Sequence, residues 1–145
     1  MQDETYPHNN PTEYRYEFTS VSANKSVRKV VLFTETENEN LYNLALMDVL
    51  DSGELCDKSE TKNQDMRKVI ATTYDTVKCF LELNKAFSVI FSGSEEKRQR
   101  LYRIAVSTNL TELSGKYLIL GLKKGHAERF QPNHIYDHYI ISNKL

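Results

Sequence analysis

The chain has few of the residues that mark special classes of protein. Its 145 residues include two cysteines, Cys56 and Cys79, which are too few for a framework of disulfides. No apolar run approaches the ~18 residues that a membrane span needs. The formal net charge is −1, so no global positive field attracts nucleic acid. Any affinity for phosphate must therefore be local.

Signatures of nucleotide binding and of nucleophilic catalysis are also missing. Gly93 stands alone where a phosphate loop or a dinucleotide fingerprint would need several glycines. No arrangement of Ser, His and Asp, or of Cys and His, indicates a catalytic nucleophile. The first residues are acidic and polar, where a signal peptide would be basic and then apolar. We expect a soluble, cytoplasmic protein without a cofactor, and the sequence favours a function other than catalysis.

The length and composition are those of one ordinary globular domain. Hydrophobic residues make up 39% of the chain and charged residues 27%, which is unlike a disordered protein. Residues 1–12 carry two prolines and few apolar side chains. They predict a flexible N-terminal leader, followed by a single α+β domain over residues 13–145.

The hydrophobic pattern predicts strands first and helices later. Alternation and β-branched residues predict three strands before residue 51, and an i, i+3, i+4 stripe over 65–84 predicts the first helix. The expected strands are 14–20, 27–34, 41–50, 87–91, 117–122 and 135–141. A second helix is expected over 95–109, and a turn over 111–116. The prediction is a single, mainly antiparallel sheet of five to six strands with two helices packed on it, in the order βββαβαββ.

The segment from Phe87 to Arg103 is the richest in chemistry. It reads as a strand, a tight turn and a capped helix whose first two turns carry four basic side chains. Glu95 and Glu96 occupy the positive end of the helix dipole, which counts against a phosphate cradle. The candidate ligand-binding residues of this corner are Ser94, Lys97, Arg98, Arg100, Tyr102 and Arg103.

A helical wheel separates these arginines. The predicted buried arc consists of Leu101, Ile104, Ala105 and Thr108. Arg100 and Arg103 lie opposite, on the solvated face, whereas Arg98 falls within the apolar arc. An arginine there must either extend its charged end past the helix terminus to solvent, or find a planar partner inside the protein or on a ligand phosphate. Tyr102 can stack on a base or on Arg98, or lie half-buried in the protein.

Other polar residues are weaker candidates for an ion pair, a metal site or proton transfer. Asp48, at the end of an apolar strand, needs a cationic partner, for which Arg98 and Lys29 are the candidates. Three histidines near the C-terminal end of the sequence have a spacing that could serve a metal or proton transfer: His126, His134 and His138. They lack the glutamate of a metalloprotease motif, so we assign no metal site and no catalytic residue.

Several segments together resemble a known family. They are residues 14–20, 27–33, 42–48, 93–103 and 136–137. The most specific element is G-S-x-x-x-R-x-R-L-Y-R, complete here from Gly93 to Arg103. The chain resembles a family of small, uncharacterised bacterial proteins catalogued as a domain of unknown function. The resemblance implies a single-domain, cytoplasmic bacterial protein with no established activity, cofactor or substrate. The chain departs from it at residues 22–24, where a glycine is expected.

Three functions remain open at this point. The corner can bind a phosphate-bearing ligand such as RNA, including as a toxin-like component. Alternatively, the same arginines meet an acidic protein partner in the interaction module of a two-gene regulatory pair, without catalysis. A third hypothesis is an enzyme that uses His134, His138 or Tyr102 as proton carriers. The sequence leaves the oligomeric state open.

Overall fold

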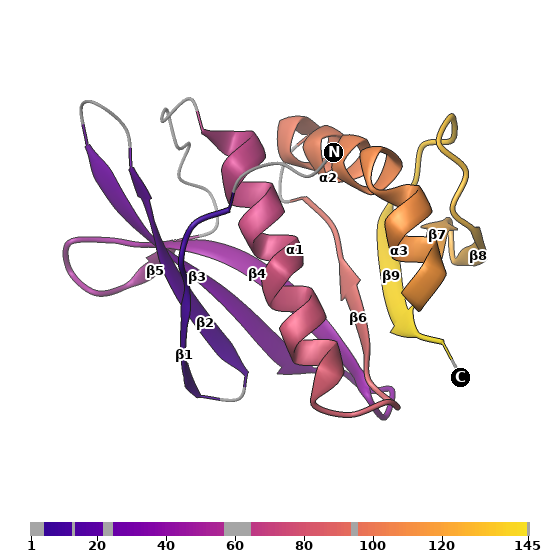
Figure 1. The fold of residues 1–145 in the computed structure, drawn as a ribbon, viewed down its shortest axis with the longest axis horizontal. Coiled ribbons are helices and arrows are strands. Elements are labelled where there is room, and N and C mark those ends of the chain that lie inside the picture. The colour runs from indigo at the N-terminus through magenta and orange to yellow at the C-terminus, as the bar shows by residue number, and fades with distance from the viewer. Residues whose placement is uncertain (1–4, 13, 22–24, 57–64, 94–95, 145) are drawn as a thin grey trace.

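Nine strands of the described chain join in one sheet, and three helices lie on one of its faces (Figure 1). This computed structural model describes residues 5–12, 14–21, 25–56, 65–93 and 96–144. The strands are β1 (Asn9–Thr12), β2 (Arg15–Val21), β3 (Ser26–Glu35), β4 (Leu41–Val49), β5 (Leu55–Cys56), β6 (Ser88–Phe91), β7 (Tyr117–Lys123), β8 (His126–Arg129) and β9 (His138–Asn143). The helices are α1 (Met66–Glu82), α2 (Glu96–Thr108) and α3 (Leu110–Lys116).

The sheet is mixed because one neighbouring pair of strands is parallel. Across the sheet the order is β1-β2-β3-β4-β6-β9-β7-β8, and β5 pairs with β4 beside this path. The parallel pair is β4 with β6, and α1 connects the two strands; the other described pairs are antiparallel. A parallel pair needs such a long crossover, and a helix is its usual form. The strand β9 lies in the interior of the sheet, between β6 and β7.

The α+β class is confirmed, but the predicted sheet of five to six strands with two helices is wrong. Eight strands follow one another across the sheet, and a third helix, α3, occupies residues predicted as a turn. The strands β1, β5 and β8, which are 4, 2 and 4 residues long, were not predicted. Such short strands carry too few residues for an alternating pattern, and their pairing with longer neighbours defines them.

Part of the predicted leader packs on the domain. The Tyr6 ring is buried and stacks on Phe18, with the ring centroids 5.9 Å apart. The Tyr6 backbone N–H donates to Thr72 Oγ1 of α1 at 2.8 Å. Residues 9–12 form β1 at the edge of the sheet. The division of the chain into a leader and one domain over 13–145 stays a prediction.

The core lies between the helices and the sheet, and it is rich in aromatic side chains. Phe80 of α1 stacks on Phe33 of β3, with the centroids 4.1 Å apart, and on Phe87 at 5.0 Å. Tyr42 of β4 meets the edge of the same Phe80 ring. Along β2, β4, β6 and β7, buried side chains alternate with more exposed ones. The buried set faces the helices, as burial of apolar surface requires.

Candidate functional site

The predicted corner at the start of α2 is only partly a surface. Ser94 and residues 22–24 lie outside the described residues, and the Lys97 side chain is not described. Arg98 and Tyr102 are buried, whereas Arg100 is exposed and Arg103 half-exposed. The burial of Arg98 agrees with its predicted inward position. The ligand-binding role of these residues stays a prediction.

The predicted buried arc of α2 is wrong in part. The buried side of the helix follows Arg98, Tyr102 and Val106, while Ile104 is 44% exposed. Tyr102 sets this rotation because its ring packs against Phe91 of β6, with the centroids 5.2 Å apart. A large aromatic ring buries more apolar area than an isoleucine, so packing favours this orientation.

Gly93 and Gln99 join β6, α2 and the segment before β9. The Gly93 N–H donates to the Gln99 side-chain oxygen, and Gln99 Nε2 donates to the carbonyls of Tyr136 and Asp137, both at 2.9 Å. A Cβ at position 93 would lie 2.3 Å from the Gln99 backbone nitrogen, closer than atoms can approach. Glycine is required here by close backbone approach. Gln99 was not among the predicted site residues, because its partners Tyr136 and Asp137 lie 37 and 38 residues away.

A charge cluster lies on the helix side of the sheet and consists of the buried Lys29, Asp48 and Arg98 and the half-buried Asp65. Lys29 of β3 and Asp48 of β4 are paired in register, and the Lys29 ammonium donates to the Asp48 carboxylate. Lys29 is 1% exposed and Asp48 is 5% exposed. Arg98 Nη1 donates to the Leu46 carbonyl at 3.1 Å. Of the two predicted cationic partners of Asp48, the structure therefore pairs Lys29 with it.

Asp65, just before α1, completes the cluster. Its Oδ2 accepts hydrogen bonds from Ser20 Oγ at 2.5 Å and from the Tyr6 hydroxyl. Its Oδ1 is buried and has no hydrogen-bond partner among the residues that the structure describes. The cluster thus holds two cations and two carboxylates on the helix side of the sheet. Asp65 was not among the predicted site residues, because its partners Ser20 and Tyr6 lie 45 and 59 residues away.

Burial governs the electrostatics of the cluster. It lowers the pKa of Lys29, and the hydrogen bond and charge of Asp48 act in the opposite direction. A buried ion pair is costly unless both partners are held in good geometry. Because Lys29 is almost fully enclosed, a ligand from solution would need a rearrangement to reach it. The cluster can therefore fix the relative positions of β3, β4 and α2.

The surface of the corner is a shallow groove between α1 and α2. We define the α1–α2 groove by its lining residues, Arg67, Ile70, Leu101, Ile104, Ala105 and Thr108. Its enclosed volume is about 20 Å³, so it suits a side chain of a partner better than a small molecule. Arg100 lies one helical turn before Ile104 and is exposed. The groove therefore combines aliphatic walls with guanidinium groups.

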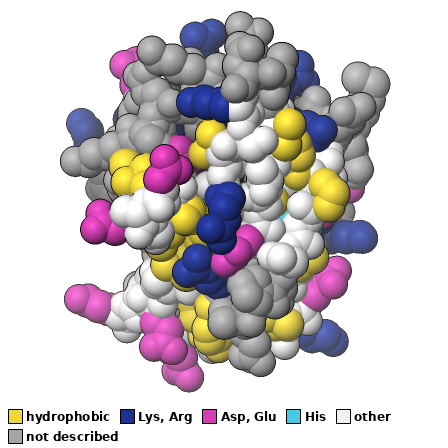
Figure 2. Space-filling model, turned by 90° about the vertical axis from the view of Figure 1, so that its left-hand side faces the viewer, with side chains coloured by type: hydrophobic (Ala, Val, Ile, Leu, Met, Phe, Trp, Pro, Cys, Tyr) yellow, Lys and Arg dark blue, Asp and Glu magenta, His cyan; other side chains and the backbone are white. Residues whose placement is uncertain are grey.

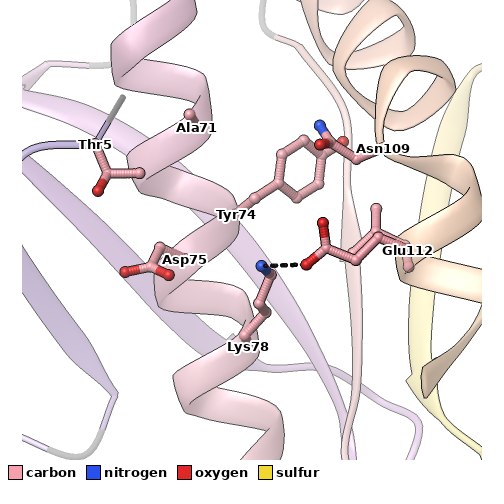
Figure 3. A pocket seen from close by; sticks show the side chains of 8 residues that line it. Thr5, Ala71, Tyr74, Asp75, Lys78, Asn109 and Glu112 are labelled. Carbon is pink, nitrogen blue, oxygen red and sulfur yellow. Dashed lines mark ion pairs between the residues drawn. The ribbon is translucent and has the colours of Figure 1, made fainter. Parts of the chain in front are cut away.

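A second cleft, between α1 and α3, is closed to ligands of ordinary size (Figure 3). Its volume is about 50 Å³, against the ~300 Å³ or more of typical small-molecule sites. Lys78 of α1 forms an ion pair across it with Glu112 of α3, with Nζ and Oε1 3.6 Å apart. Asp75 on the same helix meets His8 Nε2 at 2.9 Å. The cleft can hold water and ties the two helices together.

The structure does not bring the predicted proton carriers, His134, His138 and Tyr102, together at one site. Burial raises the pKa of Tyr102 to about 12, so it stays protonated near neutrality. His134 lies in an open depression of about 420 Å³, with Nδ1 3.4 Å from Glu128 Oε1. His138 pairs in register with Leu122 on β7. Among the described residues, no group of three His, Cys, Asp or Glu side chains could hold a metal ion.

Comparison with known proteins gives one match. A sequence model of a family of unknown function (DUF6934) matches residues 2–144. The chain belongs to DUF6934. No curated protein and no solved structure matches it. Within the described part of this DUF6934 protein, none of the helices has the length and apolar character that crossing a membrane requires.

Proposed function

We propose that this DUF6934 protein is a protein-interaction module that binds an acidic protein segment at the α1–α2 groove. The observation that carries the proposal is the burial of aromatic rings. All nine tyrosines and six phenylalanines lie among the described residues, and each of them except Tyr14 is buried. Single-stranded nucleic acid is bound largely by stacking bases on exposed rings. This surface offers almost none.

The side chains of the α1–α2 groove suit a protein partner better than a nucleic acid. Ile104 is 44% exposed beside Leu101 and Ala105, so an apolar side chain can insert there. Arg67 and Arg100 are exposed at the same place, and arginine is enriched in protein interfaces. An amphipathic segment with acidic flanks would satisfy both features. A cytoplasmic setting and a regulatory partner are part of this proposal.

Two defined probes test the proposal. Fluorescence anisotropy of a synthetic acidic amphipathic helical peptide and of a mixed-sequence single-stranded RNA compares the two ligand classes. We expect the peptide to bind, and the double substitution Arg100→Ala with Ile104→Ala to weaken it at least about tenfold. The matched control replaces Arg28 and Ile135, exposed residues outside the groove, by alanine and should leave the affinity unchanged.

Salt dependence adds a second criterion. Peptide binding with an apolar centre should survive high salt, whereas contacts to three or four phosphates of single-stranded RNA give a log–log slope near −2 to −3. Binding of RNA that is lost in Arg100→Ala with Arg103→Ala would replace the proposal with phosphate recognition. Failure of the peptide to bind the parent protein would overturn it.

A further inference from the structure

Residues 5–8, which precede β1, run along one side of α1, and we call them the strap. The strap contacts α1 and the residue before it at positions that are spaced by three, four and three residues. Positions with this spacing share one side of a helix. They are Asp65, Lys68, Thr72 and Asp75.

The Tyr6 ring fills a slot between β2 and α1. It is buried and stacks on Phe18, with 5.9 Å between the ring centroids and 18° between the ring planes. The Lys68 ammonium lies 4.2 Å from the centroid of the Tyr6 ring. A stacked ring and a cation near its face both favour an aromatic side chain in this slot.

The inner end of the slot recognises the Tyr6 hydroxyl as both donor and acceptor. The hydroxyl donates to Asp65 Oδ2 and accepts from the Val21 backbone N–H at 3.1 Å. Ser20 Oγ donates to the same Asp65 oxygen. Burial raises the pKa of Tyr6, and the hydrogen bond to Asp65 adds to this rise, so the hydroxyl keeps its proton near neutral pH. The slot therefore selects a phenol over a plain phenyl ring.

The start of α1 is weak by its own sequence, and the strap compensates for this weakness. Asp65 stands at the N-cap position, but within the described residues its carboxylate makes no capping hydrogen bond. The first turn carries Arg67 and Lys68 and no acidic residue, although the N-terminal end of a helix dipole favours negative charge. The Tyr6 backbone N–H donates to Thr72 Oγ1 at 2.8 Å, and the Thr72 hydroxyl donates to the Lys68 carbonyl at 2.7 Å.

We infer that the strap is a conformational device, in which Tyr6 bound in its phenol slot orders the first turns of α1 and its release lets them fray. Arg67 and Ile70 belong to these turns and line the α1–α2 groove. Release of the strap therefore loosens one wall of the groove. The link from the strap to partner binding rests on the proposed function.

The remaining contacts of this region hold the strap less firmly than Tyr6 does. His8 Nε2 lies 2.9 Å from Asp75 Oδ2, but the Asp75 side chain is 44% exposed. Figure 2 shows the side of the molecule toward which β1, β2 and β3 lie, where basic and acidic side chains are interspersed with hydrophobic ones. Arg28 is 65% exposed where it meets Glu17, and such pairs contribute little to stability. The seating of the strap therefore depends mainly on the buried tyrosine.

Hydrogen exchange of the full chain, followed by NMR at single amides, tests the strap. We expect Tyr6→Ala to speed the exchange of amides 69–73 at least about tenfold, while amides 77–81 of the same helix change less than about threefold. Millimolar 4-methylphenol, which is the tyrosine side chain as a free molecule, should restore slow exchange, and toluene should not. Thr5→Ala, at an exposed residue of the strap, is the matched control and should behave as the parent does.

Tyr6→Phe keeps the ring and removes only the hydroxyl, so it decides the question if the alanine variant does not fold. It should speed exchange of amides 69–73 at least about threefold. Exchange in Tyr6→Phe as slow as in the parent would overturn the inference, and so would an equal acceleration along the whole chain. A folded Tyr6→Ala variant that toluene rescues as well as 4-methylphenol would contradict the phenol slot.

The affinity for the acidic peptide is measured separately in the same variants. Tyr6→Ala should weaken peptide binding, and 4-methylphenol should restore it. Faster exchange of amides 69–73 with unchanged peptide affinity would remove the link between the strap and the groove. A parent protein that binds no peptide would overturn the proposed function alone, since the exchange measurement needs no peptide.

Discussion

At the scale of single residues, removing one charge of the buried Lys29–Asp48 pair should cost more stability than removing both. Lys29 and Asp48 are both nearly inaccessible to water and face each other on adjacent strands. Replacing Lys29 by alanine removes the ammonium that donates to the buried Asp48 carboxylate, and we expect the free energy of unfolding to fall by about 3–5 kcal/mol. The double variant Lys29→Met with Asp48→Leu removes both charges and should lie within about 1–2 kcal/mol of the parent or above it.

Urea unfolding of the parent, the single and the double variant makes this comparison. A double variant that loses as much stability as Lys29→Ala would show that the two charges are not coupled. The alternative single variant, Asp48→Leu, removes the carboxylate to which the Lys29 ammonium donates. It should be destabilised in the same way, so the cost follows the loss of the ion pair rather than one particular residue.

Arg98 and Arg100, two residues apart on α2, should respond very differently to truncation. Arg98→Ala removes the donor to the Leu46 carbonyl and empties a buried volume, which predicts a loss of about 2–4 kcal/mol. Arg100→Ala changes an exposed side chain and should stay within about 0.5 kcal/mol. Thermal unfolding measures the melting temperatures of the two variants against that of the parent protein. Equal melting temperatures for the two variants would contradict the structural role of Arg98.

At the scale of elements, the joint between β6 and α2 depends on Gly93. Alanine there would bring its Cβ within 2.3 Å of the Gln99 backbone, so α2 must shift away from β6. We expect Gly93→Ala to cost at least about 2 kcal/mol. Gly115 in α3 is the matched control, because a Cβ there meets nothing within 4 Å. Gly115→Ala should stabilise the protein by up to about 1 kcal/mol in the same denaturation series.

The sequence predicted long elements well and short ones poorly. The stripe over 65–84 and the β-branched run over 27–34 correspond to α1 and β3 because each contains enough residues to show its period. The turn expected over 111–116 is the helix α3, whose Leu113 joins the core. Only tertiary contact distinguishes these two outcomes, since a short polar segment has weak local preferences.

The candidate site could be predicted only where local sequence pattern determines the position of a side chain. The inward position of Arg98 and the need of Asp48 for a cation follow from local pattern, and both side chains are buried. The rotation of α2 could not be predicted, because Ile104 and Tyr102 compete for the core and β6 decides between them. Tyr6, Ser20 and Asp65 meet only in the folded chain.

At the scale of the whole molecule, buried tyrosines make stability depend on alkaline pH. Burial raises the pKa of Tyr16, Tyr102 and Tyr139 to about 12, from the ordinary 10.0. The folded state then holds protons that the unfolded state releases. The stabilisation is complete below pH ~10 and is lost as the pH rises through ~12. We expect each tyrosine to contribute a loss of about 1 kcal/mol between about pH 9 and about pH 11.

Lys29 acts in the opposite direction, because its lowered pKa makes the unfolded state the better proton binder below its ordinary value of 10.5. The Lys29 contribution therefore raises the free energy of unfolding as the pH rises towards 10.5, and this rise is complete above that pH. In that alkaline range the tyrosines dominate the change in stability. Urea unfolding at several pH values measures the combined contribution of Lys29 and the tyrosines to the free energy of unfolding. Tyr102→Phe should flatten the alkaline decline, while Tyr14→Phe, at an exposed ring, should not. An unchanged slope in Tyr102→Phe would contradict the burial of that hydroxyl.

The position of β9 has a consequence for synthesis on the ribosome. This strand, at residues 138–143, is inserted between β6 and β7 rather than added at an edge. Until it has been translated, the nascent chain holds two separate half-sheets whose inner edges expose unpaired amides and carbonyls. Closure of the sheet must therefore wait until β9 has been synthesised. A stalled or truncated product ending before residue 138 should be the form that chaperones retain and proteases remove.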